Sequence, residues 1–393
     1  MKKPIAILCL LTFVAAATLG AFNGGAWGAL GIGGGILFLT AACLIDGKYP
    51  PPPRSLSILM AATLGLWALE LPVSSDVALS ARTWLHLASI FIPLIWLAAP
   101  RAQQLGFSPR FVSVIAAAMA AGALALGAEL ASGGVLLHAL RGPNASLTEY
   151  NRGIAHLVIL SFPVLAALWH HRRRAAALAL ALALLFPASL TDSHTAKLAL
   201  ILGVAVTGFG FWQPVWTRRA LAAGAVVILP LPFYAQRIFS DFYARVETWH
   251  PSWTHRMEIW DYLSYRIAER PLLGWGLGTT HTLDVKHPHG NLYHYATAAA
   301  PHAHNFVTQL WVETGLPGLG CGLALMLLAL RGADKLSSSL RPFALGGWTA
   351  AVVTASFGFD FWTDALWAAF ALSAFVFGML QQQDHREPDL VDA

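Results

Sequence analysis

Long apolar stretches separated by short polar ones run along almost the whole chain. A helix that crosses the hydrocarbon core of a membrane needs roughly 20 mostly apolar residues. Stretches of this kind predict twelve spanning helices, at residues 5–22, 26–45, 56–73, 84–99, 111–131, 153–170, 175–190, 197–212, 220–234, 306–330, 342–359 and 364–380. The first stretch follows Lys2 and Lys3 and also has the form of a signal peptide, whose cleavage would leave eleven spans.

Lysine and arginine residues indicate the direction of these spans, because they are more frequent in the cytoplasmic loops of membrane proteins. With the N-terminus inside, the predicted inner segments hold fifteen of the 25 Lys and Arg residues. Six of the remaining ten lie in one long outer segment, 235–305, and long segments cross the membrane largely regardless of charge. The pattern therefore predicts that both termini are cytoplasmic.

The predicted fold class is an all-α integral membrane protein with about 12 transmembrane helices. We expect helices 1–9 in residues 1–234, a large outer loop with short amphipathic helices at 235–305, helices 10–12 in 306–380, and a cytoplasmic tail at 381–393. The composition agrees, because 56% of residues are hydrophobic and 11% are charged, whereas soluble domains contain about 25% charged residues. A soluble, disordered or disulfide-rich protein is thereby excluded.

Cysteine usage and net charge exclude further classes. The three cysteines, Cys9, Cys43 and Cys321, all lie in apolar stretches and predict neither a disulfide nor a metal site. The net charge of +5 follows the membrane topology, so no nucleic-acid partner is predicted.

Polar residues collect at one end of the predicted spans. Ionisable residues inside a membrane are costly and are therefore functional candidates. Here they lie at the outer ends and outer turns: Glu70, Asp76, Arg82, Glu129, Asp192, His194, Lys197, Asp360 and Asp364. This predicts a cavity that opens at the outer leaflet. The alternative is that these residues are helix caps and solvated turns.

The outer segment 235–305 carries eight of the fifteen histidines. Within it, apolar residues at helical spacing predict an amphipathic helix at about 253–270, which Pro271 ends and which could lie along the membrane face. The glycine-rich stretch 271–278 lacks the Lys-Ser/Thr of a phosphate-binding loop, so a tight packing turn is the better interpretation.

Two kinds of chemistry fit this histidine- and arginine-rich segment. The pairs His287/His289 and His302/His304 could hold zinc, but no further ligands stand at a recognisable spacing. The other possibility is a cation-rich pocket for a phosphorylated lipid, because arginine binds diphosphate through a planar fork. A neutral imidazole could then take the proton of an acceptor hydroxyl.

One motif resembles a known family. His304 and Asn305, nine further residues, and then Gly315-Leu-Pro-Gly318 resemble the signature of the bacterial O-antigen ligase family. Arg256, which stands 48 residues before His304, together with Trp260 and the stretch 271–278, also resembles the outer loop of that family. The specific motif is confined to about 192–318, and related polymerases share parts of it.

The resemblance implies an activity and its partners. It implies a metal-independent, cofactor-free and inverting glycosyltransferase, multi-pass in the bacterial inner membrane with its site facing the periplasm. The donor would be an undecaprenyl-diphosphate-linked glycan and the acceptor lipid A–core, both held among membrane lipids.

The resemblance also implies roles for particular residues. Arg256 would bind the diphosphate, His304 would be the general base or would orient the acceptor hydroxyl, and Asn305 would hold the imidazole. The family carries an arginine where this chain has His194, so Lys197 is expected to help His194 complete the diphosphate site, with Arg152 as another candidate by its sidedness.

Three alternatives stay open at this point. The enzyme could be an O-antigen or polysaccharide polymerase, whose acceptor is a second lipid-linked glycan. It could be a transporter or flippase of such a glycan, although polar groups are scarce through the predicted bilayer depth. Without the resemblance, His304 and Asn305 could merely cap the tenth helix, and Gly315 and Gly318 could merely loosen it.

Overall fold

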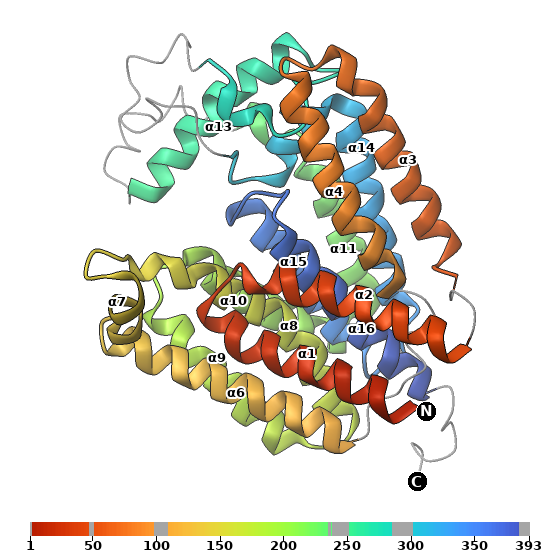
Figure 1. Cartoon of the computed structure of the whole chain (residues 1–393), viewed down its shortest axis with the longest axis vertical. Helices are drawn as coiled ribbons and strands as arrows, with labels where there is room; N and C mark the ends of the chain where they lie inside the picture. Colours follow the sequence, from red (N-terminus) through yellow and green to blue (C-terminus); the bar gives the residue numbers. More distant parts are fainter. Residues whose placement is uncertain are drawn as a thin grey trace.

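The computed structural model describes residues 2–46, 51–97, 109–234, 237, 251–284 and 302–384. Within these ranges the chain is helical and contains no β-strand (Figure 1). The helices are α1 (Lys2–Phe22), α2 (Ala26–Asp46), α3 (Arg54–Glu70), η1 (Leu71–Val73), α4 (Val77–Leu97), α6 (Pro109–Ala131), α7 (Val135–Arg141), η2 (Leu147–Tyr150), α8 (Asn151–His170), α9 (Arg174–Leu190), α10 (His194–Trp212), α11 (Pro214–Val227), α13 (Pro251–Glu269), η3 (Thr279–Thr282), α14 (Phe306–Asp334), α15 (Arg341–Phe357) and α16 (Asp364–Asp384).

A helix lies over each of the twelve predicted spans. Among the described residues, seven helical stretches are long and apolar enough to cross a membrane: Arg54–Val73, Val77–Ile95, Arg110–Ala131, Leu147–His170, His194–Trp212, Phe306–Asp334 and Asp364–Gln382. Three shorter apolar helices accompany them, Leu10–Phe22, Ala26–Leu37 and Arg174–Leu190. The chain is therefore a multi-pass membrane protein, whereas the count of twelve and the orientation of the termini stay predictions.

Small residues let the helices approach closely, as is typical of helix packing in membranes. Helices α10 and α15 pack along one another, and a Cβ added at Gly346 would lie 2.5 Å from the backbone oxygen of Gly203. Helices α1 and α8 meet in the same way, because a Cβ at Gly153 would lie 2.0 Å from the backbone oxygen of Ala21. Side chains larger than hydrogen at these positions would push the bundle apart.

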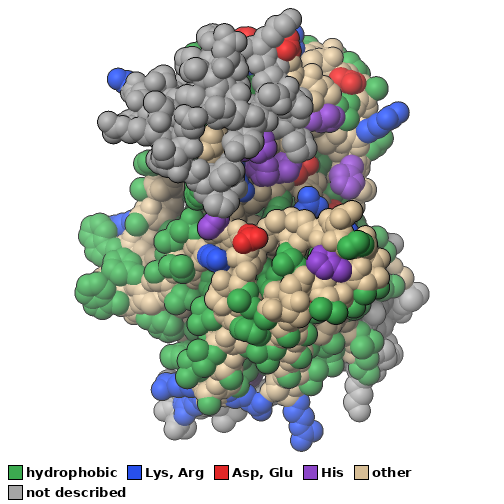
Figure 2. All heavy atoms as spheres, turned by 90° about the vertical axis from the view of Figure 1, so that its left-hand side faces the viewer, with side chains coloured by type: hydrophobic (Ala, Val, Ile, Leu, Met, Phe, Trp, Pro, Cys, Tyr) green, Lys and Arg blue, Asp and Glu red, His purple; other side chains and the backbone are tan. Residues whose placement is uncertain are grey.

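The two ends of the bundle carry different chemistry. Helices α8, α10 and α14 begin near one another, so their C-terminal ends lie at the opposite end, where the arginines of 172–174 and the Arg218–Asp334 ion pair of 3.2 Å are found. In Figure 2, Lys and Arg side chains gather at the lower end, whereas His side chains gather around a hollow near the middle of the face.

Helix α13 confirms the predicted amphipathic helix, although its apolar side packs on the protein. The buried residues of α13 form a cluster with residues of the following loop and of α14: Met257, Ile259, Trp260, Tyr262, Leu263, Ile267, Leu283, Ala303 and Val312. The expectation that this side would lie on the membrane face is therefore corrected. Its apolar area stabilises the outer segment against α14 instead.

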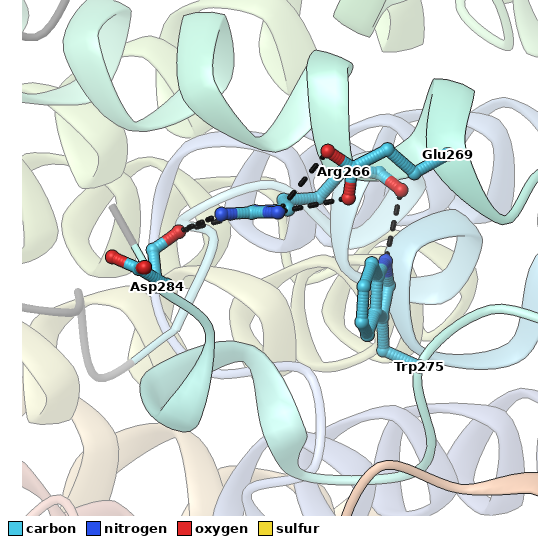
Figure 3. A network of polar contacts seen from close by, with 4 residues as sticks. All are labelled: Arg266, Glu269, Trp275 and Asp284. Atoms are coloured by element: carbon cyan, nitrogen blue, oxygen red, sulfur yellow. Dashed lines mark hydrogen bonds and ion pairs between the residues drawn. The ribbon is translucent and has the colours of Figure 1, made fainter. Parts of the chain in front are cut away.

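The C-terminal end of α13 is fixed to the glycine-rich turn (Figure 3). The indole nitrogen of Trp275 donates to the carbonyl of Arg266 over 2.8 Å. The Arg266 guanidinium in turn donates to the carbonyl of Asp284 and pairs with Glu269 over 2.8 Å. These contacts join α13, the turn and Asp284 into one unit.

The glycine-rich turn packs on α14, which confirms its interpretation as a packing turn. Its backbone amides at Trp275 and Gly276 donate to the carbonyls of Val312 and Glu313, each over 2.8 Å. The Val312 carbonyl is available because Gly315, with φ of 62° and ψ of −167°, interrupts α14, and the Glu313 carbonyl is available because Pro317, four residues on, has no N–H. Only glycine adopts this backbone conformation readily, so the motif glycine creates the break onto which the turn docks.

Candidate functional site

His304 has an unusual backbone conformation. It adopts a φ of 51°, the left-handed region, at the junction between the outer segment and α14. For a residue other than glycine such a conformation costs about 1–3 kcal/mol and persists only where the surroundings hold it. The preceding residue supplies one such restraint, because the carbonyl of the buried Ala303 accepts a hydrogen bond of 2.8 Å from the indole of Trp260.

Asn305 supplies the other restraint, in a role that differs from the predicted one. Its side-chain oxygen accepts from the amide of Thr308 over 3.0 Å and so caps α14, and its side-chain nitrogen donates to the carbonyl of Ser356 over 3.1 Å. The amide group is thus engaged with the backbone of α14 and α15 and does not hold the imidazole. Asn305 instead fixes the start of α14 against the end of α15.

The imidazole of His304 is held by two other groups. Its Nδ1 lies 2.9 Å from the carbonyl oxygen of Gly358 and 3.1 Å from Nε2 of His302. Gly358 follows the last residue of α15, so this contact joins residues that are 54 positions apart. The ring is therefore positioned by the loop between α15 and α16, which the sequence motif does not include.

Arg256 lines a cavity of about 100 Å³, and His304 contacts the wall of this cavity through the Gly358 carbonyl. Arg256 stands one helical turn before Trp260 on α13, so the Trp260–Ala303 hydrogen bond brings its face of the helix to His304. Arg256 and Gly358 both line the cavity, whose remaining wall is formed by Asn151, Asp192, Ser193, His194, Thr195, Leu198, Trp253, Phe357 and Phe359.

Burial sets the protonation of this site. Burial lowers the pKa of His304 to about 3, and the neighbouring His302 and Arg256 charges lower it further, against the raising effect of the Gly358 carbonyl. Burial likewise lowers the pKa of His302 to about 4, with further lowering by Arg152 and Arg256. Burial also lowers the pKa of Arg256, but a guanidinium stays charged in proteins. At neutral pH the site therefore combines neutral imidazoles with fixed cations.

The N-terminus of α10 forms another wall of the cavity. Ser193 caps this 19-residue helix by accepting from the amide of Ala196 over 3.2 Å, and His194 and Thr195 begin it. The positive end of the helix dipole thus faces the space that Arg256 also lines, an arrangement that favours an anion.

The other residues predicted for the diphosphate site, His194, Lys197 and Arg152, differ in how they relate to the cavity. His194 lines the cavity directly. Leu198, one turn further into α10, also lines the cavity, and Lys197 directly precedes it in the sequence. The Arg152 guanidinium stacks 5.6 Å from the ring centroid of Phe359, a wall residue, and it acts electrostatically on His302. Arg152 therefore borders the site from α8.

The motif glycines shape α14 around the site. A Cβ added at Gly315 would lie 2.1 Å from the backbone oxygen of Leu272, and the amide of Leu316 donates to the Pro271 carbonyl over 3.0 Å. A Cβ at Gly318 would lie 3.2 Å from the indole nitrogen of Trp67 in α3. These glycines do more than loosen the helix, because they permit the outer segment and α3 to reach it.

Sequence reasoning missed Glu313. This carboxylate is 1% exposed and accepts hydrogen bonds from the Gly278 amide, the Thr280 hydroxyl and the Trp362 indole. It joins the glycine-rich turn to the loop between α15 and α16. A lone carboxylate in an apolar stretch was the available signal, since such residues are functional candidates by default.

The two histidine pairs considered for zinc have different outcomes. His287 and His289 lie outside the described residues. His302 and His304 contact each other, and within the described part of the chain no group of three or more His, Cys, Asp or Glu side chains is arranged to hold a metal ion.

The helices and the cavity lined by Arg256 and His194 define a multi-pass membrane protein with a polar site. Residues 176–323 match the family described as O-Antigen ligase. A Rickettsia bellii protein named "Putative polysaccharide ligase" is 30% identical over 198 residues, which are 48% of this chain and 47% of that protein. A Rickettsia felis protein of the same name is 27% identical over 222 residues, 54% of this chain and 53% of that protein.

These comparisons confirm the resemblance to the O-antigen ligase family found in the sequence. The matched region includes α10, α13, the strained His304 and both motif glycines, which together form most of the site. The chain spans about half the length of the curated relatives it matches.

Proposed function

We propose that this protein is a glycosyltransferase that ligates O-antigen from undecaprenyl diphosphate onto lipid A–core. The reaction would take place at the periplasmic face of the bacterial inner membrane, where the lipid tails of donor and acceptor lie in the bilayer. The observation that carries the proposal is the single cavity shared by Arg256, the start of α10 and the Gly358 carbonyl that holds His304.

The donor diphosphate occupies the cationic side of this cavity. Arg256 binds it through the guanidinium fork and stabilises the charge that grows as the diphosphate leaves. The N-terminus of α10 and His194 contact the same anion, and Arg152 adds positive potential from the rim. Lys197 contributes at longer range from the next turn of α10, as a point charge rather than a fork.

The acceptor hydroxyl binds at His304, which acts as general base. A carbonyl oxygen can only accept a hydrogen bond, so the contact with Gly358 places the hydrogen of His304 on Nδ1. Nε2 then keeps its lone pair for the hydroxyl proton. A single displacement of this kind inverts the anomeric centre. Because the diphosphate is already a good leaving group, the reaction needs no metal ion or other cofactor.

Reconstitution with purified lipids tests this proposal. We expect the wild-type protein to transfer glycan from undecaprenyl diphosphate to lipid A–core, also in excess EDTA. Arg256→Ala and His304→Ala should each lose transfer at unchanged protein levels, because one lost transition-state contact typically costs on the order of 100- to 1000-fold in rate. Full activity of both variants would refute the assigned roles.

The acceptor separates ligation from polymerisation. A deletion strain of a ligase makes bare core, whereas a deletion strain of a polymerase makes core with one repeat unit. Transfer to a second lipid-linked glycan in place of lipid A–core would establish the polymerase. Movement of the donor across vesicles without any product would establish a flippase.

A further inference from the structure

The imidazole rings of His302 and His304 lie against each other, tilted by 53°. Their ring centroids are 4.0 Å apart, and Nε2 of His302 lies 3.1 Å from Nδ1 of His304. The same Nδ1 lies 2.9 Å from the Gly358 carbonyl oxygen. One nitrogen of His304 is thus within hydrogen-bond distance of two partners at once.

The backbone carbonyl decides the tautomers of both rings. Because Gly358 offers only an acceptor, Nδ1 of His304 carries the hydrogen. Nε2 of His302 then cannot carry a hydrogen as well, since two N–H groups would face each other across 3.1 Å. Nε2 of His302 is therefore an acceptor, and the Nδ1 hydrogen of His304 is shared between His302 and Gly358.

We infer that His302 is a positioning residue, which accepts a hydrogen bond from Nδ1 of His304 and so presents the Nε2 lone pair of His304 to the acceptor hydroxyl. This inference rests on the proposed function. In the reaction the hydroxyl oxygen bonds to the anomeric carbon as the carbon–oxygen bond to the diphosphate breaks. The electron pair of that bond leaves with the diphosphate, and the hydroxyl proton moves to Nε2 of His304.

The surroundings explain why a second acceptor is useful. Burial of this pair disfavours a further positive charge, and so do the nearby Arg152 of α8 and Arg256 of α13. When His304 takes the hydroxyl proton it becomes an imidazolium among these cations. The hydrogen bond from Nδ1–H of His304 to the lone pair of His302 opposes that penalty, because hydrogen bonds from charged donors are about twice as strong as neutral ones.

Two substitutions separate the hydrogen bond from the space that the ring fills. His302→Phe keeps a ring but removes the acceptor, so we expect kcat to fall about 10- to 100-fold, while KM for donor and acceptor stays within about twofold. His302→Gln restores a side-chain oxygen that can accept, so its kcat should return to within about fivefold of wild type. The matched control is His281→Phe, at an exposed histidine of η3, which should leave kcat unchanged.

Wild-type kcat in His302→Phe would overturn the inference, and so would a His302→Gln variant as slow as His302→Phe. A loss of transfer that coincides with a lower melting temperature is resolved by a second measurement, which needs no substrate. Nitrogen-15 NMR of histidine-labelled protein in detergent should show His304, assigned by the signals lost in His304→Gln, with its hydrogen on Nδ1. It should show Nε2 of His302 without a hydrogen.

A hydrogen on Nε2 of His302 would overturn the inference whatever the substrate. Absence of transfer by the wild-type protein together with the expected tautomers would instead refute the proposed function alone. The two failures are therefore distinguishable.

Discussion

Replacing Trp260 with phenylalanine removes the hydrogen bond that holds the strained backbone of His304. The indole donates over 2.8 Å to the carbonyl of the buried Ala303, so the variant leaves that carbonyl without this donor, at a cost of about 1–3 kcal/mol. The left-handed conformation of His304, with φ of 51°, itself costs about 1–3 kcal/mol. The two energies are comparable, so the loss of one restraint is enough to let the imidazole relax away from its working position.

A loss of one to two kcal/mol corresponds to about a 5- to 30-fold change in the population of the working His304 conformation. We therefore expect kcat for glycan transfer to fall by about that factor in Trp260→Phe, with KM for the donor little changed, in an assay with purified lipids in detergent. The matched control is Trp275→Phe, which removes an indole hydrogen bond of the same length to the Arg266 carbonyl near the C-terminal end of α13. Equal kcat losses in both variants, or none in Trp260→Phe, would refute this reasoning.

Three further predictions concern protonation and folding. Because burial lowers the pKa of His304 to about 3, its neutral form persists as pH falls, and kcat/KM for transfer should stay flat when measured from pH 7 to 5. With a general base of the ordinary pKa of 6.5, kcat/KM would fall roughly 25-fold over this range. Gly315→Ala should lower the melting temperature in detergent, whereas Gly320→Ala, with no atom within 4 Å of the added Cβ, should not. Glu313→Leu should lower the melting temperature more than Glu313→Gln, because leucine leaves three buried donors without this acceptor and glutamine keeps one acceptor oxygen.

The helices and one side of the site could be predicted from the sequence. Apolar length predicted a helix at each of twelve stretches where the structure has one, because a stretch that must satisfy its backbone inside a membrane forms a helix. Local spacing located α13, with Pro271 just beyond its end. Arg256 and His304 came from the resemblance rather than from periodicity. The structure places Arg256 in the cavity wall and the His304 ring against Gly358 of the same wall.

The rest depends on contacts between residues that are far apart in the chain. The partner of the His304 ring is a backbone carbonyl of Gly358, 54 residues away, and no side-chain pattern marks it. Asn305 was expected to hold the ring, but its amide meets the nearer unpaired groups at the start of α14, as helix caps do. Glu313 was hidden inside an apolar stretch, and only the fold shows the donors that it satisfies.

A double-mutant cycle on transfer by the reconstituted protein tests the central claim, that Arg256 and His304 serve one reaction in one cavity. The rates of Arg256→Lys, His304→Gln and the double variant would be measured beside the wild type with the same purified donor and acceptor. Groups that act as a unit in catalysis are strongly non-additive. We predict that each single variant loses on the order of 100-fold or more and that the double variant is hardly slower than either. Losses that multiply in the double variant, or a wild-type rate in either single variant, would contradict the account.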